Sequence, residues 1–165
     1  MPIAANKIAE CTKSAIYCYG TGYIFELRAK EVRWKTRLLT FLGIACPVAV
    51  GASVAAFSTN SKATGVVIFV TALLSIPQVI FSVWSLVAKW DDNLYYSLES
   101  KTDNYRLSND YRQLSGDPAL DQVEFENRYA ILDTQGRQRK GLDERYDISE
   151  PEKRRGMRAG LRQWQ

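Results

Sequence analysis

Two long uncharged runs constrain the fold of this chain most. Residues 38–57 and 63–88 carry no formal charge, and Lys62 is the only charged residue between Arg37 and Lys89. At about 1.5 Å per residue, a helix over either run can cross a hydrocarbon layer of about 30 Å. The polar residues 58–64 between them are of the kind that turn a chain. The sequence therefore predicts an all-α membrane protein with a two-helix transmembrane hairpin over residues 38–88.

The basic residues around these runs predict their orientation. They crowd the outer ends of the two runs, whereas the connecting segment carries only Lys62. Basic residues next to a span favour the cytoplasmic side, so both termini are expected in the cytoplasm. The expected segments around the hairpin are an N-terminal amphipathic helix (1–37), a helical region (89–135), and a linker with a basic amphipathic helix (136–165).

Polar residues inside the second run share one helical face. They follow steps of three and four, which places them on one side of a helix. Lipid offers a buried amide no partner, so Gln78 is expected to face another helix or water. The stripe either holds helices together within or between subunits, or lines a water-filled path in an assembly of several copies. Its members are Thr71, Ser75, Gln78, Ser82 and Ser85.

The first run is rich in small residues. Gly43, Pro47, Gly51 and Ala55 recur every fourth residue, and such a ridge lets another helix approach closely in lipid. Pro47 and Pro77 each remove one hydrogen bond within a run, so both positions predict kinks. These kinks are either structural or the hinges of a gate.

Residues 6–36 predict an amphipathic helix. Its small and apolar residues alternate in steps of three and four, and a helix of this kind packs on a partner. That partner is either the C-terminal half of this chain or a second subunit. Gly20 and Gly22 predict a break or kink. The aligned positions are Ile8, Cys11, Ala15, Cys18, Gly22, Phe25, Ala29 and Val32.

The C-terminal third predicts two further helices beyond the one that follows the second run. Asp117 before Pro118 is typical of a helix start, and Gly136 of its end. Residues 137–148 are expected to be an exposed linker. Ser149 and Glu152 predict a capping box at the start of the last helix.

That last helix carries a basic face. Met157, Leu161 and Trp164 are expected on one side of it, and arginines on the other. Such a helix either lies on an anionic inner leaflet or is a solvated positive tail that enforces the orientation. The arginines are Arg155, Arg158 and Arg162.

Several functional classes are disfavoured by what the sequence lacks. Without histidine, the commonest general base and metal ligand is missing, and no GxxxxGK, GxGxxG or CxxC motif occurs. The expectation is a protein that is not an enzyme and needs no cofactor or metal. Nucleic-acid binding is not expected, because Glu150 and Glu152 lie beside the basic tail and only Trp164 could stack on a base.

The order of these segments resembles the SLATT family. The resemblance covers about residues 25–132 and rests on Arg33-Trp34-Lys35, the small-residue run, the second run, and the tyrosine-rich residues 104–114. It implies a membrane effector of the bacterial inner membrane that oligomerises and permeabilises the bilayer when triggered in a defence or mobile-element system. A sensor or nucleotide-signalling protein would be its partner.

A second resemblance lies at the C-terminus. The segment KRRGMRAGLR at residues 153–162 is similar to the lead-in to a paired-CxxC zinc module of a family of mobile-element membrane proteins. No such cysteines occur up to Gln165, so either the chain is shortened or the resemblance is partial, and no metal site is carried over.

The function that competes with a membrane effector is a passive anchor or scaffold whose cytoplasmic helices bind a partner protein.

Overall fold

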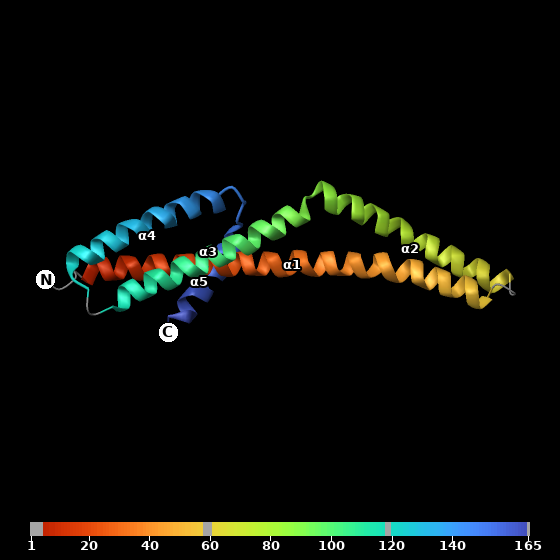
Figure 1. Ribbon diagram of the computed structural model, residues 1–165, viewed down its shortest axis with the longest axis horizontal. Helices are drawn as coiled ribbons and strands as arrows, with labels where there is room; N and C mark the ends of the chain where they lie inside the picture. Colours follow the sequence, from red (N-terminus) through yellow and green to blue (C-terminus); the bar gives the residue numbers. More distant parts are fainter. Residues whose placement is uncertain (1–4, 58–60, 118–119, 165) are drawn as a thin grey trace. The chain divides into compact units, whose positions relative to one another are not determined.

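The computed structural model is all α-helical, as the sequence predicts. Five helices are present in the described part of the chain: α1 (Ala5–Phe57), α2 (Ser61–Val87), α3 (Trp90–Gly116), α4 (Gln122–Asp143) and α5 (Glu150–Gln163) (Figure 1). The structure describes residues 5–57, 61–117 and 120–164. Within these ranges it leaves out the side chains of residues 46, 49–51, 53–57, 61–64, 67, 71, 74, 78 and 86.

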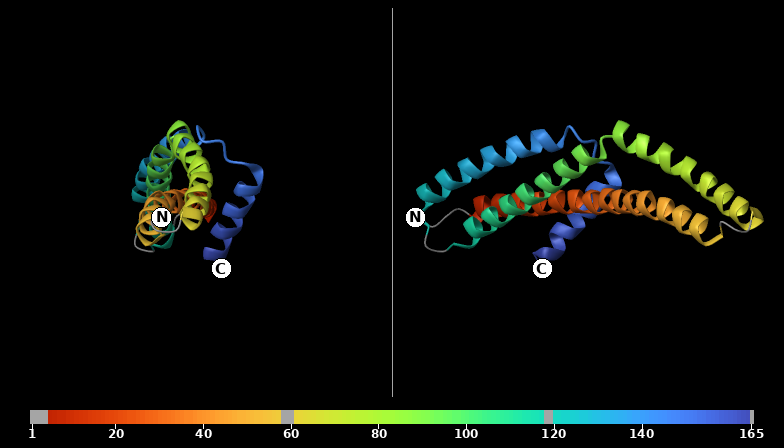
Figure 2. Two further views of the ribbon diagram at one scale, coloured as in Figure 1. Left: turned by 90° about the vertical axis from the view of Figure 1, so that its right-hand side faces the viewer. Right: turned by 45° about the vertical axis from the view of Figure 1, so that its right-hand side comes forward.

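The chain divides into two compact units, which we call the bundle unit and the apolar unit. The bundle unit comprises residues 1–29 and 95–165, and the apolar unit comprises residues 30–94. In the bundle unit, α4 and α5 lie on different sides of the N-terminal part of α1 (Figure 2). Both boundaries between the units fall within helices, because α1 and α3 each have residues in both units.

The core of the bundle unit forms between α1, α3 and α4. Its cluster of buried residues joins Cys11, Ala15 and Cys18 of α1 to Leu107, Tyr111 and Leu114 of α3 and Phe125 of α4. The amphipathic face of residues 6–36 therefore packs, over its N-terminal part, on the C-terminal half of the same chain. Of the two partners left open by the sequence, this is the one present in the structure.

The predicted break at Gly20 and Gly22 is wrong, because α1 continues through both glycines. Each glycine allows a close approach by another helix. A Cβ atom on Gly22 would lie 2.9 Å from Cδ1 of Tyr105 in α3. Tertiary packing in the bundle unit thus outweighs the cost of about 1 kcal/mol that glycine carries in a helix.

The boundaries predicted for α4 are also wrong. The helix begins after Asp121, whose carboxylate accepts a hydrogen bond from the backbone N–H of Glu124 (2.8 Å), and it passes through Gly136 to Asp143. A Cβ atom on Gly136 would lie 2.9 Å from the hydroxyl oxygen of Tyr111, so this glycine serves packing and does not end the helix. Residues 137–143, expected in an exposed linker, form the last turns of α4.

The start of α5 is as predicted. The backbone N–H and the hydroxyl of Ser149 both donate to the carboxylate of Glu152, at 2.9 and 2.8 Å. This capping box supplies partners at the N-terminus of the helix, where backbone donors have none within the helix.

The apolar unit holds one helix that is long and apolar enough to cross a membrane, among the described residues. It is α2, over Ile68–Ser85, and none of the described side chains in that stretch is buried. The sequence predicted a second span over residues 38–57; these residues are helical within α1, but many of their side chains lie outside the described set. Lys89, with a φ of 48°, separates α2 from α3, so the helical region predicted from residue 89 begins as a separate helix.

Candidate functional site

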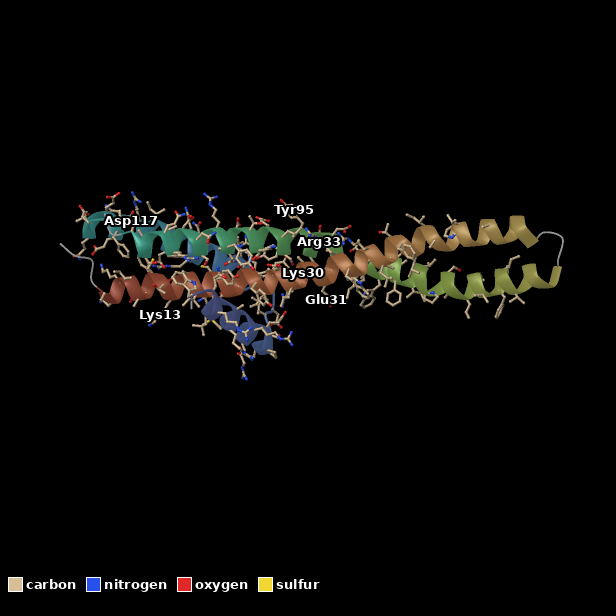
Figure 3. All side chains as sticks on the ribbon, turned by 90° about the horizontal axis from the view of Figure 1, so that it is seen from below. Lys13, Lys30, Glu31, Arg33, Tyr95 and Asp117 are labelled. Carbon is tan, nitrogen blue, oxygen red and sulfur yellow. The ribbon has the colours of Figure 1, made fainter. Side chains whose placement is uncertain are left out.

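Large exposed apolar side chains follow the described part of α2 along most of its length. Figure 3 shows few charged side chains along this part of the apolar unit, whereas Lys30, Glu31 and Arg33 are polar positions at its beginning. Val87 and Phe69, the most exposed of the large apolar side chains of α2, are exposed by 72% and 69%. Other exposed apolar side chains of α2 are Val66, Leu73, Ile76, Val79, Ile80, Phe81, Val83 and Trp84.

Two hydroxyls of the predicted polar stripe bond within their own helix. Ser75 donates to the carbonyl of Ala72 and Ser85 donates to the carbonyl of Ser82, both at 2.8 Å. A serine that donates to the preceding turn needs no partner outside the helix. The side chains of Thr71 and Gln78, which also belong to the stripe, lie outside the described residues.

The C-terminal end of the stripe lines a groove within the apolar unit. Ser82 and Ser85 share this groove, of about 400 Å³, with Thr36 and Thr40 of α1. The hydroxyls of both threonines donate to carbonyls one turn earlier in α1. The structure therefore brings this part of the stripe beside polar residues of α1. The groove is completed by Leu39, Lys89, Trp90, Asp91 and Asp92.

The predicted packing and hinge residues lie within helices. Gly43 is half-buried in α1, and Pro47 and Pro77 are exposed in α1 and α2, both of which continue through the prolines. Gly51 and Ala55 belong to α1, but their side chains lie outside the described residues. The roles predicted for these positions in helix packing and gating stay predictions.

A buried ion pair near the end of α4 was missed by the sequence analysis. The carboxylate of Asp143 accepts hydrogen bonds from Tyr96, Ser100 and Asn104 of α3, each at 2.7 Å, and from Arg139 at 3.0 Å. Arg139 also donates to Asp103 at 2.9 Å. The spacing of Arg139 and Asp143 by four residues was a signal of helix, and it was overlooked because this segment was assigned to a linker.

The burial of this cluster indicates that it stabilises the packing of α3 on α4. Arg139 and Asp143 are 6% and 3% exposed, and burial with the hydrogen bond to Asp143 raises the pKa of Tyr96. A tyrosine held neutral and donating to a carboxylate fixes α3 on α4. No group of three or more potential metal ligands occurs among the described residues.

A second ion pair holds the start of α5 on α1. The guanidinium of Arg28 donates to both carboxylate oxygens of Glu152, each at 2.9 Å, and to the backbone carbonyl of Asp147 at 2.7 Å. The hydrogen bonds from Arg28, and after them those from Ser149, lower the pKa of Glu152 to about 2. A bidentate arginine–carboxylate pair fixes direction as well as distance, so it positions α5 along α1.

The predicted basic face of α5 is present in part. Arg155, Arg158 and Arg162 are exposed, as are Met157 and Leu161. Trp164 was expected beside these two apolar residues, but it packs against the core of the bundle unit, with Arg112 5.6 Å from its ring centre. The apolar part of this face is therefore smaller than the sequence predicted.

The fold and these contacts define a class of protein: an all-helical chain with a packed four-helix bundle unit and an exposed apolar helix. The sequence matches the Mobilome CxxCx(11)CxxC protein family over residues 8–165, and the chain belongs to that family. No curated protein and no solved structure is detectably similar to it.

The family assignment corrects the resemblance to the SLATT family. The match covers residues 8–165, which include the whole region on which that resemblance rested, and nothing found for this chain supports SLATT membership. The cysteine pairs of the family's description do not occur here, because the three cysteines are Cys11, Cys18 and Cys46. Cys11 and Cys18 are buried free thiols.

Proposed function

We propose that this protein is a membrane-anchored scaffold in which α2 lies in the bilayer and the bundle unit binds a partner protein. The observation that carries the proposal is the stretch Ile68–Ser85 of α2, which is long enough to span and has no buried side chain among its described residues. The core helix of a water-soluble domain would bury such a stretch, and a signal sequence would lie near the N-terminus. Neither alternative accounts for an exposed apolar helix in the middle of a chain.

The finer topology of the proposal is a transmembrane hairpin with both termini in the cytoplasm. Residues 38–57 of α1 would form the other span, and Lys62, at the beginning of α2, would reach the opposite surface. The basic residues at the outer ends of the two runs support this orientation, because cytoplasmic flanks are enriched in lysine and arginine. A bacterial inner membrane and a homo-oligomer are parts of the same proposal.

A scaffold is favoured over a pore because the described serines of α2 and the described buried polar groups already have hydrogen-bond partners within the chain. Ser75 and Ser85 donate to carbonyls of α2, so neither requires water in the membrane. In the described residues, every buried side-chain nitrogen and oxygen has a hydrogen-bond partner. No buried polar group among the described residues therefore awaits a partner, and the exposed helix faces of the bundle unit are where another protein would bind.

Alkaline extraction of isolated membranes tests the anchor. The wild-type chain is expected to stay in the membrane pellet, whereas a chain with Ile76→Lys and Ile80→Lys is expected in the supernatant. Each lysine near the middle of a span costs about 2.5–3.5 kcal/mol. The matched control is Val123→Lys with Ile131→Lys, at two exposed positions of α4 in the bundle unit, which should leave the chain in the pellet. Extraction of the wild-type chain at alkaline pH would refute the anchor.

Permeabilisation of the membrane is the second candidate function. The observation in its favour is the groove in which Ser82 and Ser85 lie beside Thr36 and Thr40, since hydroxyls from two helices can line a polar path in an assembly. The test is expression in growing cells with a potential-sensitive dye. Depolarisation by the wild type that Gln78→Leu abolishes would support this function. Absence of depolarisation by the wild type would favour the scaffold, and unchanged depolarisation by Gln78→Leu would remove the stripe from the mechanism.

A further inference from the structure

The side of α5 that packs on α1 is built from glycine. A Cβ atom on Gly160 would lie 2.6 Å from the carbonyl oxygen of Ile16, and one on Gly156 would lie 2.5 Å from that of Gly20. Both glycines of α5 are buried. Since the helix docks through backbone, its longer side chains point away from α1 and are not needed for docking.

The acidic residues of α5 are paired with basic residues other than the three arginines of its basic face. Glu150 accepts from Lys153 at 2.8 Å, and Glu152 is held by Arg28. In the part of the chain that the structure describes, Arg155, Arg158 and Arg162 form no salt bridge. The outward face of α5 therefore presents positive charge that pairs with no described acidic residue of the bundle unit.

Exposed apolar side chains lie beside this charge. Met157 and Leu161 are 45% and 50% exposed, one turn apart on the edge of the arginine face. Arginines combined with partly exposed aliphatic side chains match the boundary between phosphate headgroups and acyl chains. We propose that the outward face of α5, formed by Arg155, Met157, Arg158, Leu161 and Arg162, binds the surface of an anionic lipid bilayer. This inference rests on the proposed function, which places the chain at a membrane.

The alternative occupant, a single-stranded nucleic acid, is disfavoured by the same geometry. Stacking on aromatic side chains contributes much of the affinity for single strands. The only aromatic residue of this segment, Trp164, packs against the core under the guanidinium of Arg112. No aromatic ring remains on the outward face of α5, whereas two aliphatic side chains do.

An environment-sensitive fluorophore on α5 of the full chain tests the inference. The probe is a nitrobenzoxadiazole label on Leu161→Cys in a chain with Cys46→Ala, reconstituted into vesicles of phosphatidylcholine alone or mixed with phosphatidylglycerol. We expect a blue shift and an intensity gain only with phosphatidylglycerol, reduced by 1 M salt, since the Debye length falls to about 3 Å. The triple variant Arg155→Gln, Arg158→Gln, Arg162→Gln should lose the gain.

The matched control removes the same charge elsewhere on the bundle unit. Arg106→Gln, Arg128→Gln and Arg145→Gln replace three exposed arginines outside α5 and should keep the fluorescence gain. Circular dichroism checks that both triple variants remain helical. An equal gain in neutral and anionic vesicles, or an equal loss in the two triple variants, would overturn the inference.

Separate outcomes distinguish this inference from the proposed function. Labelled chain that co-floats with neutral vesicles but shows no gain with phosphatidylglycerol would overturn the role of α5 and leave the anchor intact. Chain that does not co-float with any vesicle would overturn the anchor. A short single-stranded DNA that reproduces the gain without anionic lipid would overturn the lipid assignment in favour of nucleic acid.

Discussion

Gly20 and Gly156 form a reciprocal backbone contact between α1 and α5. A Cβ atom on Gly20 would lie 2.7 Å from the carbonyl oxygen of Gly156, and one on Gly156 would lie 2.5 Å from the carbonyl oxygen of Gly20. Neither position has room for a methyl group, because the obstructing atoms are backbone. The two helices therefore meet at a distance that only glycine permits.

Gly156→Ala should destabilise the docking of α5. The added methyl group meets backbone in α1, and overpacking of this kind typically costs about 1–3 kcal/mol. The measurement is the thermal unfolding of the bundle unit, followed by circular dichroism in detergent, together with the rate of trypsin cleavage within α5. Gly141→Ala is the control, since nothing lies within 4 Å of its Cβ position; it should be neutral or stabilising by about 0.4–1 kcal/mol. Equal effects of the two substitutions would contradict the close contact.

Asp143→Ala should be among the most destabilising single changes in the bundle unit. It removes the acceptor of Tyr96, Ser100 and Asn104 and leaves Arg139 buried with less compensation. Breaking a buried ion pair from one side costs about 3–5 kcal/mol. Urea unfolding measures this loss. Glu144→Ala, which removes the partner of Lys140 in an exposed pair, should cost less than about 1 kcal/mol; a comparable loss there would mean that burial is not the cause.

The ion pair of Arg28 and Glu152 should make stability depend on acid pH. The pKa of Glu152 is lowered from 4.5 to about 2 in the folded protein. Its contribution is thus fully present above about pH 4.5 and is lost as the pH falls through about 2.

The measurement is the difference in melting temperature between the wild type and Glu152→Gln over this pH range. The difference should be largest above about pH 4.5 and should shrink toward pH 2. The control Glu124→Gln breaks an exposed pair with Arg128 and should change the melting temperature little. A difference that does not change with pH would assign the effect of Glu152→Gln to packing.

Cys11 and Cys18 should be unreactive in the folded protein. Burial raises the pKa of the Cys11 thiol to about 11, and burial with the nearby Asp143 raises that of Cys18 to about 12, so little thiolate is present at pH 8. In a Cys46→Ala chain, a disulfide reagent at pH 8 should label neither thiol until denaturant is added. Thr102→Cys in the same chain, at an exposed position of α3, should react at once. Rapid labelling of the native cysteines would show that this core opens.

Gly20 and Gly22 of α1 show what the sequence predicts about this helix and what it does not. The alternation of Cys11, Ala15, Cys18, Phe25 and Ala29 predicted their burial, because helical periodicity is a local property of the chain. The same local reasoning predicted a break at Gly20 and Gly22, since glycine is unfavourable in an isolated helix. The contacts with Gly156 and Tyr105 that stabilise the helix there lie far away in the sequence.

The segment after Gly136 also shows that local sequence patterns do not predict which charged residues become buried. Arg139 and Asp143 looked like members of an exposed charged linker, and only the packing of α4 on α3 buries them together. The sequence predicted the arginines of α5 on one helical face, whereas it could not predict that glycine docks this helix and that Trp164 turns into the core. Burial of a charge depends on which helices meet, and this is decided by tertiary contacts.

By itself, the sequence determined the helical class, the capping box at Ser149 and Glu152, and the apolar character of α2, because these follow from the order of neighbouring residues. The tertiary structure alone decided the partners of the polar groups. Asp143 binds three side chains of α3, and Glu152 binds Arg28 of α1. Hydrogen-bond partners more than a turn apart are set by helix packing, which no local pattern specifies.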